Sequence, residues 1–150
     1  MKILILYDIR SNYNVGAMFR TADGAGVSMI YLVGYTPSPI DRFGRPVAEI
    51  HKTALGAEQV VPFKVVSSIV ELVERLKSEG FRVVAVEQDE RSVLLNDFTV
   101  PTKVAYIMGS ETEGLPKEVL DTVDTILEIP MFGTKESLNV SVTAGIVLYH

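Results

Sequence analysis

The sequence contains no cysteine and no apolar run of membrane-spanning length, and both absences narrow its class. Without cysteine, the chain of 150 residues forms no disulfide, thiolate metal site or cysteine nucleophile, which fits a reducing compartment. The apolar opening, residues 1–7, is too short for a signal-peptide core and is followed by no small-residue cleavage site. We therefore expect a cytoplasmic protein with no membrane segment.

Positive charge is also scarce, since 14 Lys and Arg residues stand against 19 Asp and Glu residues and the net charge is −5. Proteins that bind nucleic acid normally rely on lysine and arginine for their phosphate contacts. The charge is unevenly distributed, however, with +2 over residues 1–52 and −7 over the remaining 98. This difference is interpreted either as a local basic surface or as ordinary solvated charge.

The length and composition indicate one globular domain. A chain of 150 residues, 47% hydrophobic and 22% charged, buries a single core of ordinary size. No repeat, low-complexity tract or linker interrupts the sequence. We expect residues 1–150 to form one domain without a second substrate-binding domain.

Apolar runs that alternate with amphipathic segments predict an α/β fold. Strands are expected at residues 2–7, 29–33, 60–66, 82–86, 103–108 and 125–129. Pro62 makes the third of these an edge or irregular strand. Helices are expected from a cap at Asn14 to Gly24 or Gly26, and over residues 68–79 with Ser68 as cap. The alternation predicts a mostly parallel sheet with helices on both faces.

Two further segments are less regular. Residues 34–46 contain three prolines and two glycines, together with Arg42 and Arg45, and predict a long loop with a function of its own. The last 13 residues, which follow Ser137, alternate apolar and other residues like a strand. They suit equally well a buried helix capped by Ser137.

Three segments place polar residues or glycines where expected strands end, at the edge where open α/β sheets bind ligands. The first is residues 14–22, in which Asn14 at a helix start and Arg20 on the polar side would face a phosphate-bearing ligand. The alternative interpretation is a helix cap and an unrelated surface arginine.

The second segment, residues 107–116, combines a strand, a glycine turn and a helix that begins near Pro116. Its glycines allow close backbone approach, and free N–H groups can hold an adenosine or a carboxylate. The pattern is neither a P-loop nor GxGxxG, which disfavours common triphosphate and dinucleotide sites. Glu111 and Glu113 have no histidine nearby, so solvated carboxylates are favoured over metal ligands.

The third segment, residues 129–141, carries Asn139 and Ser141 in a largely apolar stretch. Buried polar groups cost free energy unless they are hydrogen-bonded, so these residues belong either to a core network or to a site. His51 and His150 lie in no such setting, and we expect both to be solvated.

In this order and spacing, the three segments resemble the three motifs of the SpoU or TrmH-like family of RNA ribose methyltransferases, and residues 52–58 also look like its small members. The resemblance implies transfer of a methyl group from S-adenosylmethionine to a ribose 2′-hydroxyl of transfer or ribosomal RNA. It also implies a C-terminal trefoil knot, a final helix and a homodimer, and it calls for no metal. Larger relatives carry an RNA-binding extension that we do not expect in residues 1–150.

The resemblance further implies roles for individual residues. Arg20 would be catalytic, supported by Asn14, Glu111, Ser137 and Asn139. The cofactor would be held by backbone groups of Gly109, Ile129, Met131 and Leu138. Apart from the resemblance, the expected lack of an RNA-binding extension leaves RNA contacts to the core dimer, and we expect them at Arg10, Arg42, Arg45 and Lys52. A guanidinium with a pKa of about 12.5 or more is a poor base, so we expect Arg20 to bind a phosphate and stabilise the developing alkoxide.

Three alternatives stay open at this point. The domain could be a catalytically silent or partner-dependent module of the same fold that binds RNA or cofactor, because fold does not fix function. It could be a flavodoxin-like nucleotide-binding domain, although this leaves the segment around Asn139 unexplained. It could also be a knotted methyltransferase that acts on a base.

Overall fold

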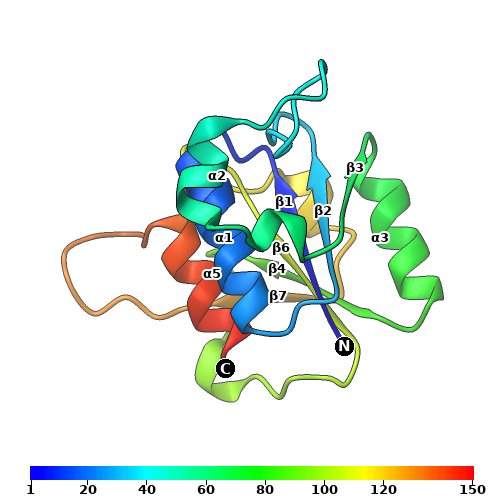
Figure 1. Cartoon of the computed structure of the whole chain (residues 1–150). Helices are drawn as coiled ribbons and strands as arrows, with labels where there is room; N and C mark the ends of the chain where they lie inside the picture. The colour runs from blue at the N-terminus through cyan, green and yellow to red at the C-terminus, as the bar shows by residue number, and fades with distance from the viewer.

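The computed structural model describes all residues 1–150 and contains a seven-stranded sheet in which every strand pairing is parallel (Figure 1). The strand order is β3-β2-β1-β6-β4-β7-β5. The strands are β1 (Lys2–Tyr7), β2 (Met29–Val33), β3 (Phe63–Val66), β4 (Arg82–Val86), β5 (Val93–Leu94), β6 (Val104–Met108) and β7 (Thr125–Glu128). The expected parallel α/β sheet is confirmed, and the knotted threading stays a prediction.

Helices cover both faces of the sheet, as the alternation of elements predicts. The helices are α1 (Asn12–Gly24), α2 (Ala48–Ala54), α3 (Ile69–Ser78), α4 (Lys117–Leu120) and α5 (Val140–Leu148). Short 3₁₀ turns lie at Ala57–Gln59 and Leu95–Asp97. One core joins α1, α2 and α5 to the sheet, and a second core joins α3 and α4 to the opposite face (Figure 1). None of these helices combines the length and the apolar character that a membrane crossing requires.

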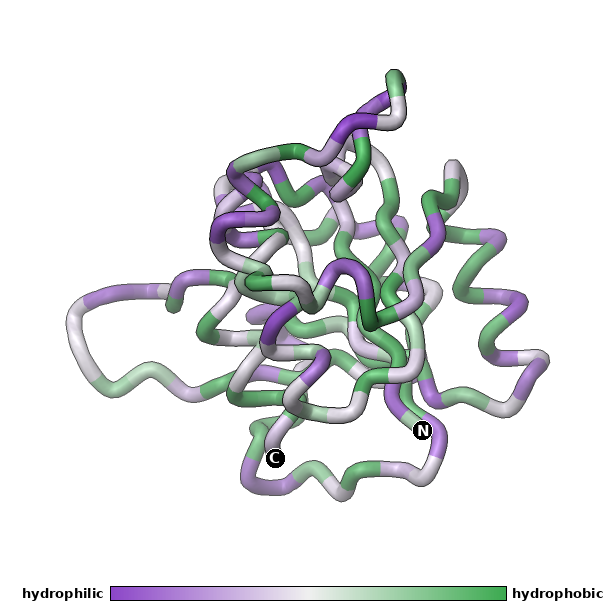
Figure 2. Tube along the Cα trace, viewed as in Figure 1, coloured by the Kyte–Doolittle hydropathy of each residue, from purple (hydrophilic) through white to green (hydrophobic).

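The central strand β1 shows why its sequence is continuously apolar. Leu4 and Leu6 pack in the core under α1 and α5, whereas Ile3 and Ile5 pack in the core under α3. Successive side chains of a strand point to opposite faces, so a strand covered on both sides needs apolar residues throughout. Figure 2 shows the same hydrophobic character along the middle of the sheet.

Helices α1 and α5 begin at capping residues other than the expected ones. Ser11, not Asn14, caps α1, and its Oγ accepts a hydrogen bond from the backbone N–H of Asn14 at 3.2 Å. Asn139, not Ser137, caps α5 through Oδ1, which accepts from the N–H of Ser141 at 2.9 Å. Both errors arise because several good capping residues stand side by side, and only the backbone path selects one of them.

The remaining elements follow the expectation with local differences. The third strand lies at the edge, as expected, but begins only at Phe63, after Pro62. Helix α3 begins at the expected cap, since Ser68 Oγ accepts from the N–H of Glu71 at 3.2 Å. The final segment is a helix because Val140, Ala144, Val147 and Leu148 share its buried face. Helix α2 and strand β5, which are short and lack a clear periodicity, were not expected.

Candidate active site

A cavity of about 730 Å³ opens at the carboxyl ends of β4, β6 and β7. This edge is where open parallel sheets bind ligands, and the volume suits a small molecule. All three sequence segments contribute to the cavity. The lining includes every residue expected to hold a cofactor, namely Gly109, Ile129, Met131 and Leu138, and four expected to support catalysis, namely Asn14, Glu111, Ser137 and Asn139.

The glycine turn after β6 forms one wall of the cavity. The N–H of Gly114 donates to the carbonyl of Ser110 at 2.9 Å, and the buried Ser110 Oγ accepts from the N–H of Thr112 at 3.3 Å. A Cβ added at Gly109 would lie 2.7 Å from the carbonyl carbon of Gly114, a distance that real Cβ atoms do not adopt. Glycine at position 109 therefore lets the turn fold back on the strand end and present its backbone to the cavity.

Glu111 connects this turn to the start of α1. Its carboxylate accepts from the backbone N–H of Arg10 at 3.2 Å and from that of Ser11 at 3.3 Å. Burial acts to raise the pKa of Glu111, but hydrogen bonds from its own backbone, from Arg10 and Ser11 and from the Asn14 side chain together hold that pKa below its ordinary value. Glu111 is thus a structural anion at neutral pH.

Asn14 and Asn139 join the first segment to the third. The Asn139 amide donates to Asn14 Oδ1 at 3.4 Å, and Asn139 Oδ1 accepts from the N–H and the hydroxyl of Ser141 at 2.9 and 2.6 Å. Asn139 is exposed toward the cavity, so it belongs to a site and not to a core network. Polar side chains from three distant parts of the chain therefore meet at one edge of the sheet.

The third segment forms a long loop between β7 and α5, which extends away from the body in Figure 1, and only its two ends line the cavity. Its residues 132–139 are exposed. Gln88, after β4, donates through Nε2 to the carbonyl of Glu136 at 2.5 Å. This contact and the amide pair at Asn139 fix the end of the loop nearest α5 beside the cavity.

The charged residues that line the cavity are all acidic, and Arg10 lies just outside the lining beside Glu113. Glu87, Glu111, Glu113 and Glu136 line the cavity, and no lysine, arginine or histidine does. Such a lining disfavours phosphate-bearing ligands and favours a ligand with net positive charge. It argues against a flavodoxin-like nucleotide site. No cluster of three or more His, Asp, Glu or Cys side chains is placed to hold a metal ion.

Arg20 lies apart from this cavity. It is exposed on α1 and lines a separate hollow of about 700 Å³ with Lys52, Thr53 and Tyr149. Within one chain Asn14 and Arg20 therefore line two different pockets, and a common ligand for both stays a prediction. Six residues correspond to about 240° around a helix, so the two side chains leave α1 in different directions.

The arrangement of the three segments matches a known family. The model of the SpoU rRNA Methylase family covers residues 1–149. The chain belongs to this family. The expected resemblance is therefore confirmed over nearly the whole chain.

Individual relatives agree with this assignment. The chain is 35% identical to the 23S rRNA (guanosine-2'-O-)-methyltransferase RlmB of Neisseria meningitidis over 146 residues, which are 97% of this chain and 56% of the relative. The SpoU domain thus spans little more than half of the length of the curated relatives it matches. The AdoMet-bound rRNA methyltransferase from Sinorhizobium meliloti superposes with a TM-score of 0.88 at 29% identity, over 99% of this chain and 54% of that chain.

A second solved structure matches this chain over nearly its whole length. It concerns the 2-OH methylation of C/U34 on tRNA. Its TM-score is 0.82 at 28% identity, and the match covers 99% of this chain and 92% of that chain. The fold of the SpoU domain therefore occurs with and without large additional segments.

Sequence reasoning missed two residues of the SpoU cavity, Glu87 and Gln88. Glu87 Oε2 accepts from the N–H of Leu115 at 3.0 Å and so braces the far side of the glycine turn against β4. The position of Glu87 was a usable signal, because a carboxylate directly after a buried parallel strand lies at the ligand-binding edge. This signal is weak, however, because a lone carboxylate at a strand end resembles an ordinary solvated residue in the sequence.

The four residues expected to contact RNA lie in three places. Arg10 stands at the cavity, 3.8 Å from Glu113, and Lys52 shares the hollow of Arg20. Arg42 and Arg45 lie together on the loop that follows β2. His51 is exposed, as expected, but its Nδ1 lies 2.7 Å from Glu58. His150 Nε2 lies 3.0 Å from the carbonyl of Phe98.

Proposed function

We propose that this SpoU-family protein transfers the methyl group of S-adenosylmethionine to a ribose 2′-hydroxyl of ribosomal or transfer RNA. The observation that carries the proposal is the cavity in which all three motifs meet, with exposed turn backbone and carboxylates but no cationic side chain. S-adenosylmethionine has a sulfonium, an ammonium and one carboxylate, so its net positive charge suits this lining. The names of the relatives, an rRNA methyltransferase among them, support the same reaction.

The chain's own residues hold the cofactor in this proposal. Backbone groups of Gly109, Ile129, Met131 and Leu138, which all line the cavity, would hold the adenosine. The bound cofactor supplies an activated methyl group on a positively charged sulfur, so the protein contributes mainly alignment. The geometry of the cavity entrance is maintained by four polar residues, namely Asn14, Glu111, Ser137 and Asn139.

Arg20 acts on the RNA side of the same reaction. The O–CH₃ bond forms as the S–CH₃ bond breaks, and the hydroxyl proton leaves to solvent. Because a guanidinium is a poor base at neutral pH, Arg20 binds the neighbouring phosphate and stabilises negative charge on the oxygen. An exposed guanidinium outside the cavity suits a role toward RNA rather than toward a cationic cofactor.

We further propose that the protein is a cytoplasmic homodimer in which Arg20 of one copy completes the cavity of the other. The support is geometric, because Arg20 and the cavity occupy different surfaces of one chain. A two-fold dimer brings two different surface patches of identical chains together twice. Both halves of the site are then present at each cavity.

The proposal is tested by incubating the protein with methyl-labelled S-adenosylmethionine and, separately, ribosomal and transfer RNA from cells that lack it. We expect label in 2′-O-methyl nucleosides of one RNA class. Arg20→Ala should lose about 10²- to 10³-fold in rate, as when one transition-state donor is removed. Its cofactor affinity in calorimetry should equal that of wild type, because Arg20 is placed on the RNA side of the shared site and is absent from the residues that hold the cofactor.

Other outcomes separate the alternatives. Label in a base would assign the protein to base methylation. No label in either RNA, with cofactor bound tightly, would favour a silent or partner-dependent binding module. Full turnover by Arg20→Lys would contradict bidentate phosphate binding, since lysine keeps the charge but lacks the planar donor fork.

A further inference from the structure

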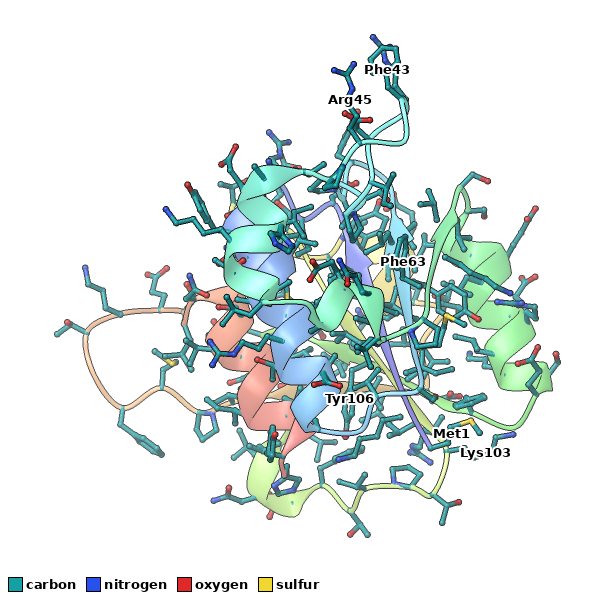
Figure 3. All side chains as sticks on the ribbon, viewed as in Figure 1. Met1, Phe43, Arg45, Phe63, Lys103 and Tyr106 are labelled. Carbon is teal, nitrogen blue, oxygen red and sulfur yellow. The ribbon has the colours of Figure 1, made fainter.

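The loop between β2 and α2 projects from the body and presents an aromatic ring at its end (Figure 3). An antiparallel bridge joins Ile40 to Pro46, and the N–H of Asp41 donates to the carbonyl of Arg45 at 2.8 Å. The N–H of Val47 donates to the carbonyl of Pro39 at 2.9 Å. The loop is therefore a short hairpin and not an irregular excursion.

Hydrogen bonds also fix the tip of this hairpin. Asp41 Oδ1 accepts from the N–H of Phe43 at 2.8 Å and from that of Arg45 at 2.9 Å. Gly44 has a φ of +76°, which closes the turn in a conformation that favours glycine. The carboxylate of Asp41 is thus engaged by the backbone, and the side chains at the tip are held in a defined arrangement.

The tip side chains combine an exposed aromatic ring with free positive charge. Phe43 is 64% exposed. The Arg42 and Arg45 guanidinium carbons lie 4.8 and 5.0 Å from the centroid of its ring. Neither arginine takes part in any of the ion pairs of the structure. The hairpin therefore presents an exposed cluster of one aromatic ring and two guanidinium planes, without ion pairs, to a partner outside the chain.

The base of the hairpin is tied to the edge of the sheet that carries the cavity. Asp8, directly after β1, accepts from the N–H of Tyr35 at 2.8 Å. The buried Thr36 Oγ1 donates to the carbonyl of Leu6 at 2.8 Å and accepts from the N–H of Ile9 at 3.1 Å. Strands β2, β1 and β6 are parallel neighbours in the sheet. The hairpin after β2 and the cavity at the end of β6 therefore lie at the same edge of the sheet.

We infer that the tip formed by Arg42, Phe43 and Arg45 binds an unpaired nucleotide of the RNA substrate, with the base stacked at Phe43 and the arginines at flanking phosphates. This inference rests on the proposed function, since it names how the same reaction selects its RNA. Unpaired bases stack on aromatic and guanidinium planes, whereas duplex RNA hides its base faces. Single-stranded or loop RNA is therefore the form recognised.

The sequence has no tryptophan, so Phe43→Trp places a unique fluorophore at the tip. We expect its emission to be quenched by an RNA stem-loop and much less by a fully paired duplex of the same length or by inorganic polyphosphate. Val70→Trp, at an exposed position of α3 on the sheet face opposite α2, is the matched control and should respond to none of them. Equal quenching by stem-loop, duplex and polyphosphate would overturn base stacking, and so would quenching only by an acidic peptide.

Affinity measurements separate stacking from charge. Phe43→Leu keeps an apolar side chain without a π face and should weaken stem-loop binding about tenfold, within the range for loss of one base stack. Arg42→Ala and Arg45→Ala should each make the negative slope of log K against log salt shallower by about 0.7, the value for one single-strand phosphate contact. Wild-type affinity for the stem-loop in Phe43→Leu would overturn the inference.

Methyl transfer distinguishes failure of this inference from failure of the proposed function. With a methylated RNA in hand, Phe43→Leu should raise KM for RNA and leave kcat and cofactor affinity unchanged. If wild type methylates RNA and Phe43→Leu has the same KM, the inference fails and the proposed function stands. If no RNA is methylated but the stem-loop alone quenches Phe43→Trp, the reaction fails and RNA binding by the tip stands.

Discussion

The hydroxyl of Tyr106 is the only buried side-chain polar atom of the molecule without a hydrogen-bond partner. Tyr106 lies in β6 with its ring in the core under α1 and α5 (Figure 3). Burial raises its pKa, so the group is neutral, and its desolvation is not repaid by any hydrogen bond. Its sequence context, a strand of apolar residues, shows that Tyr106 is buried but not where its hydroxyl points.

Replacing Tyr106 with phenylalanine should therefore leave stability unchanged or raise the free energy of unfolding by up to about 1 kcal/mol. Tyr31→Phe is the matched control, because Arg75 Nη2 donates to the Tyr31 hydroxyl at 3.0 Å. The control should lower the free energy of unfolding by about 1 kcal/mol. Urea denaturation measures both, and a larger loss in Tyr106→Phe than in Tyr31→Phe would refute the assignment.

Glu111 illustrates a contact that sequence reasoning cannot reach. Asn14, Glu111 and Asn139 are identifiable because polar residues at strand ends mark the ligand edge of an α/β sheet. The partners of the Glu111 carboxylate are backbone N–H groups of Arg10 and Ser11, about a hundred residues earlier in the chain. Backbone donors carry no signature in sequence, so this link appears only in the fold.

The lowered pKa of Glu111 gives its contribution to stability a pH dependence with a definite sign. A carboxyl with a depressed folded-state pKa stabilises the fold above the unfolded value of about 4.3, and the contribution disappears as pH falls through the folded value. Glu111→Gln should cost about 1 kcal/mol or less at pH 7, since the residue is partly exposed, and nothing at low pH. Urea denaturation across pH tests this, with the exposed Glu113→Gln as control. A difference that grows on acidification would contradict it.

Helices α1 and α2 pack closely because α1 has a glycine at the contact. A Cβ added at Gly16 would lie 2.0 Å from Thr53 Oγ1 and 2.3 Å from the carbonyl oxygen of Ile50. Sequence periodicity predicts α1, but not the short α2, since seven residues show too little of a helical repeat. The role of Gly16 is likewise invisible until the two helices are placed together.

Gly16→Ala should lower the free energy of unfolding by about 1 to 3 kcal/mol, because overpacking outweighs the better helix propensity of alanine. The matched control is Gly133→Ala, where an added Cβ meets nothing within 4 Å. The control should change stability by less than about 0.5 kcal/mol. Thermal and urea denaturation measure the two variants, and equal stability of both would show that α2 moves away without cost.

For the whole molecule, the sheet and its two covered faces were predictable from the alternation of apolar strands and amphipathic helices. The separation of Arg20 from the cavity was not, because it depends on how α1 packs on the sheet and therefore on which side of the helix faces the cavity. The central claim is that these separate surfaces are the two halves of one methyl-transfer site. Such a site requires two copies of the chain.

Subunit mixing tests this claim most directly, by measuring RNA 2′-O-methylation by two inactive variants together. Arg20→Ala removes one half, and Met131→Arg puts a positive charge into the cavity and should abolish binding of a cationic cofactor. After subunit exchange, mixed dimers carry one intact site, and the mixture should recover about a quarter of wild-type activity. A mixture that stays inactive although native mass spectrometry shows mixed dimers would contradict the shared site.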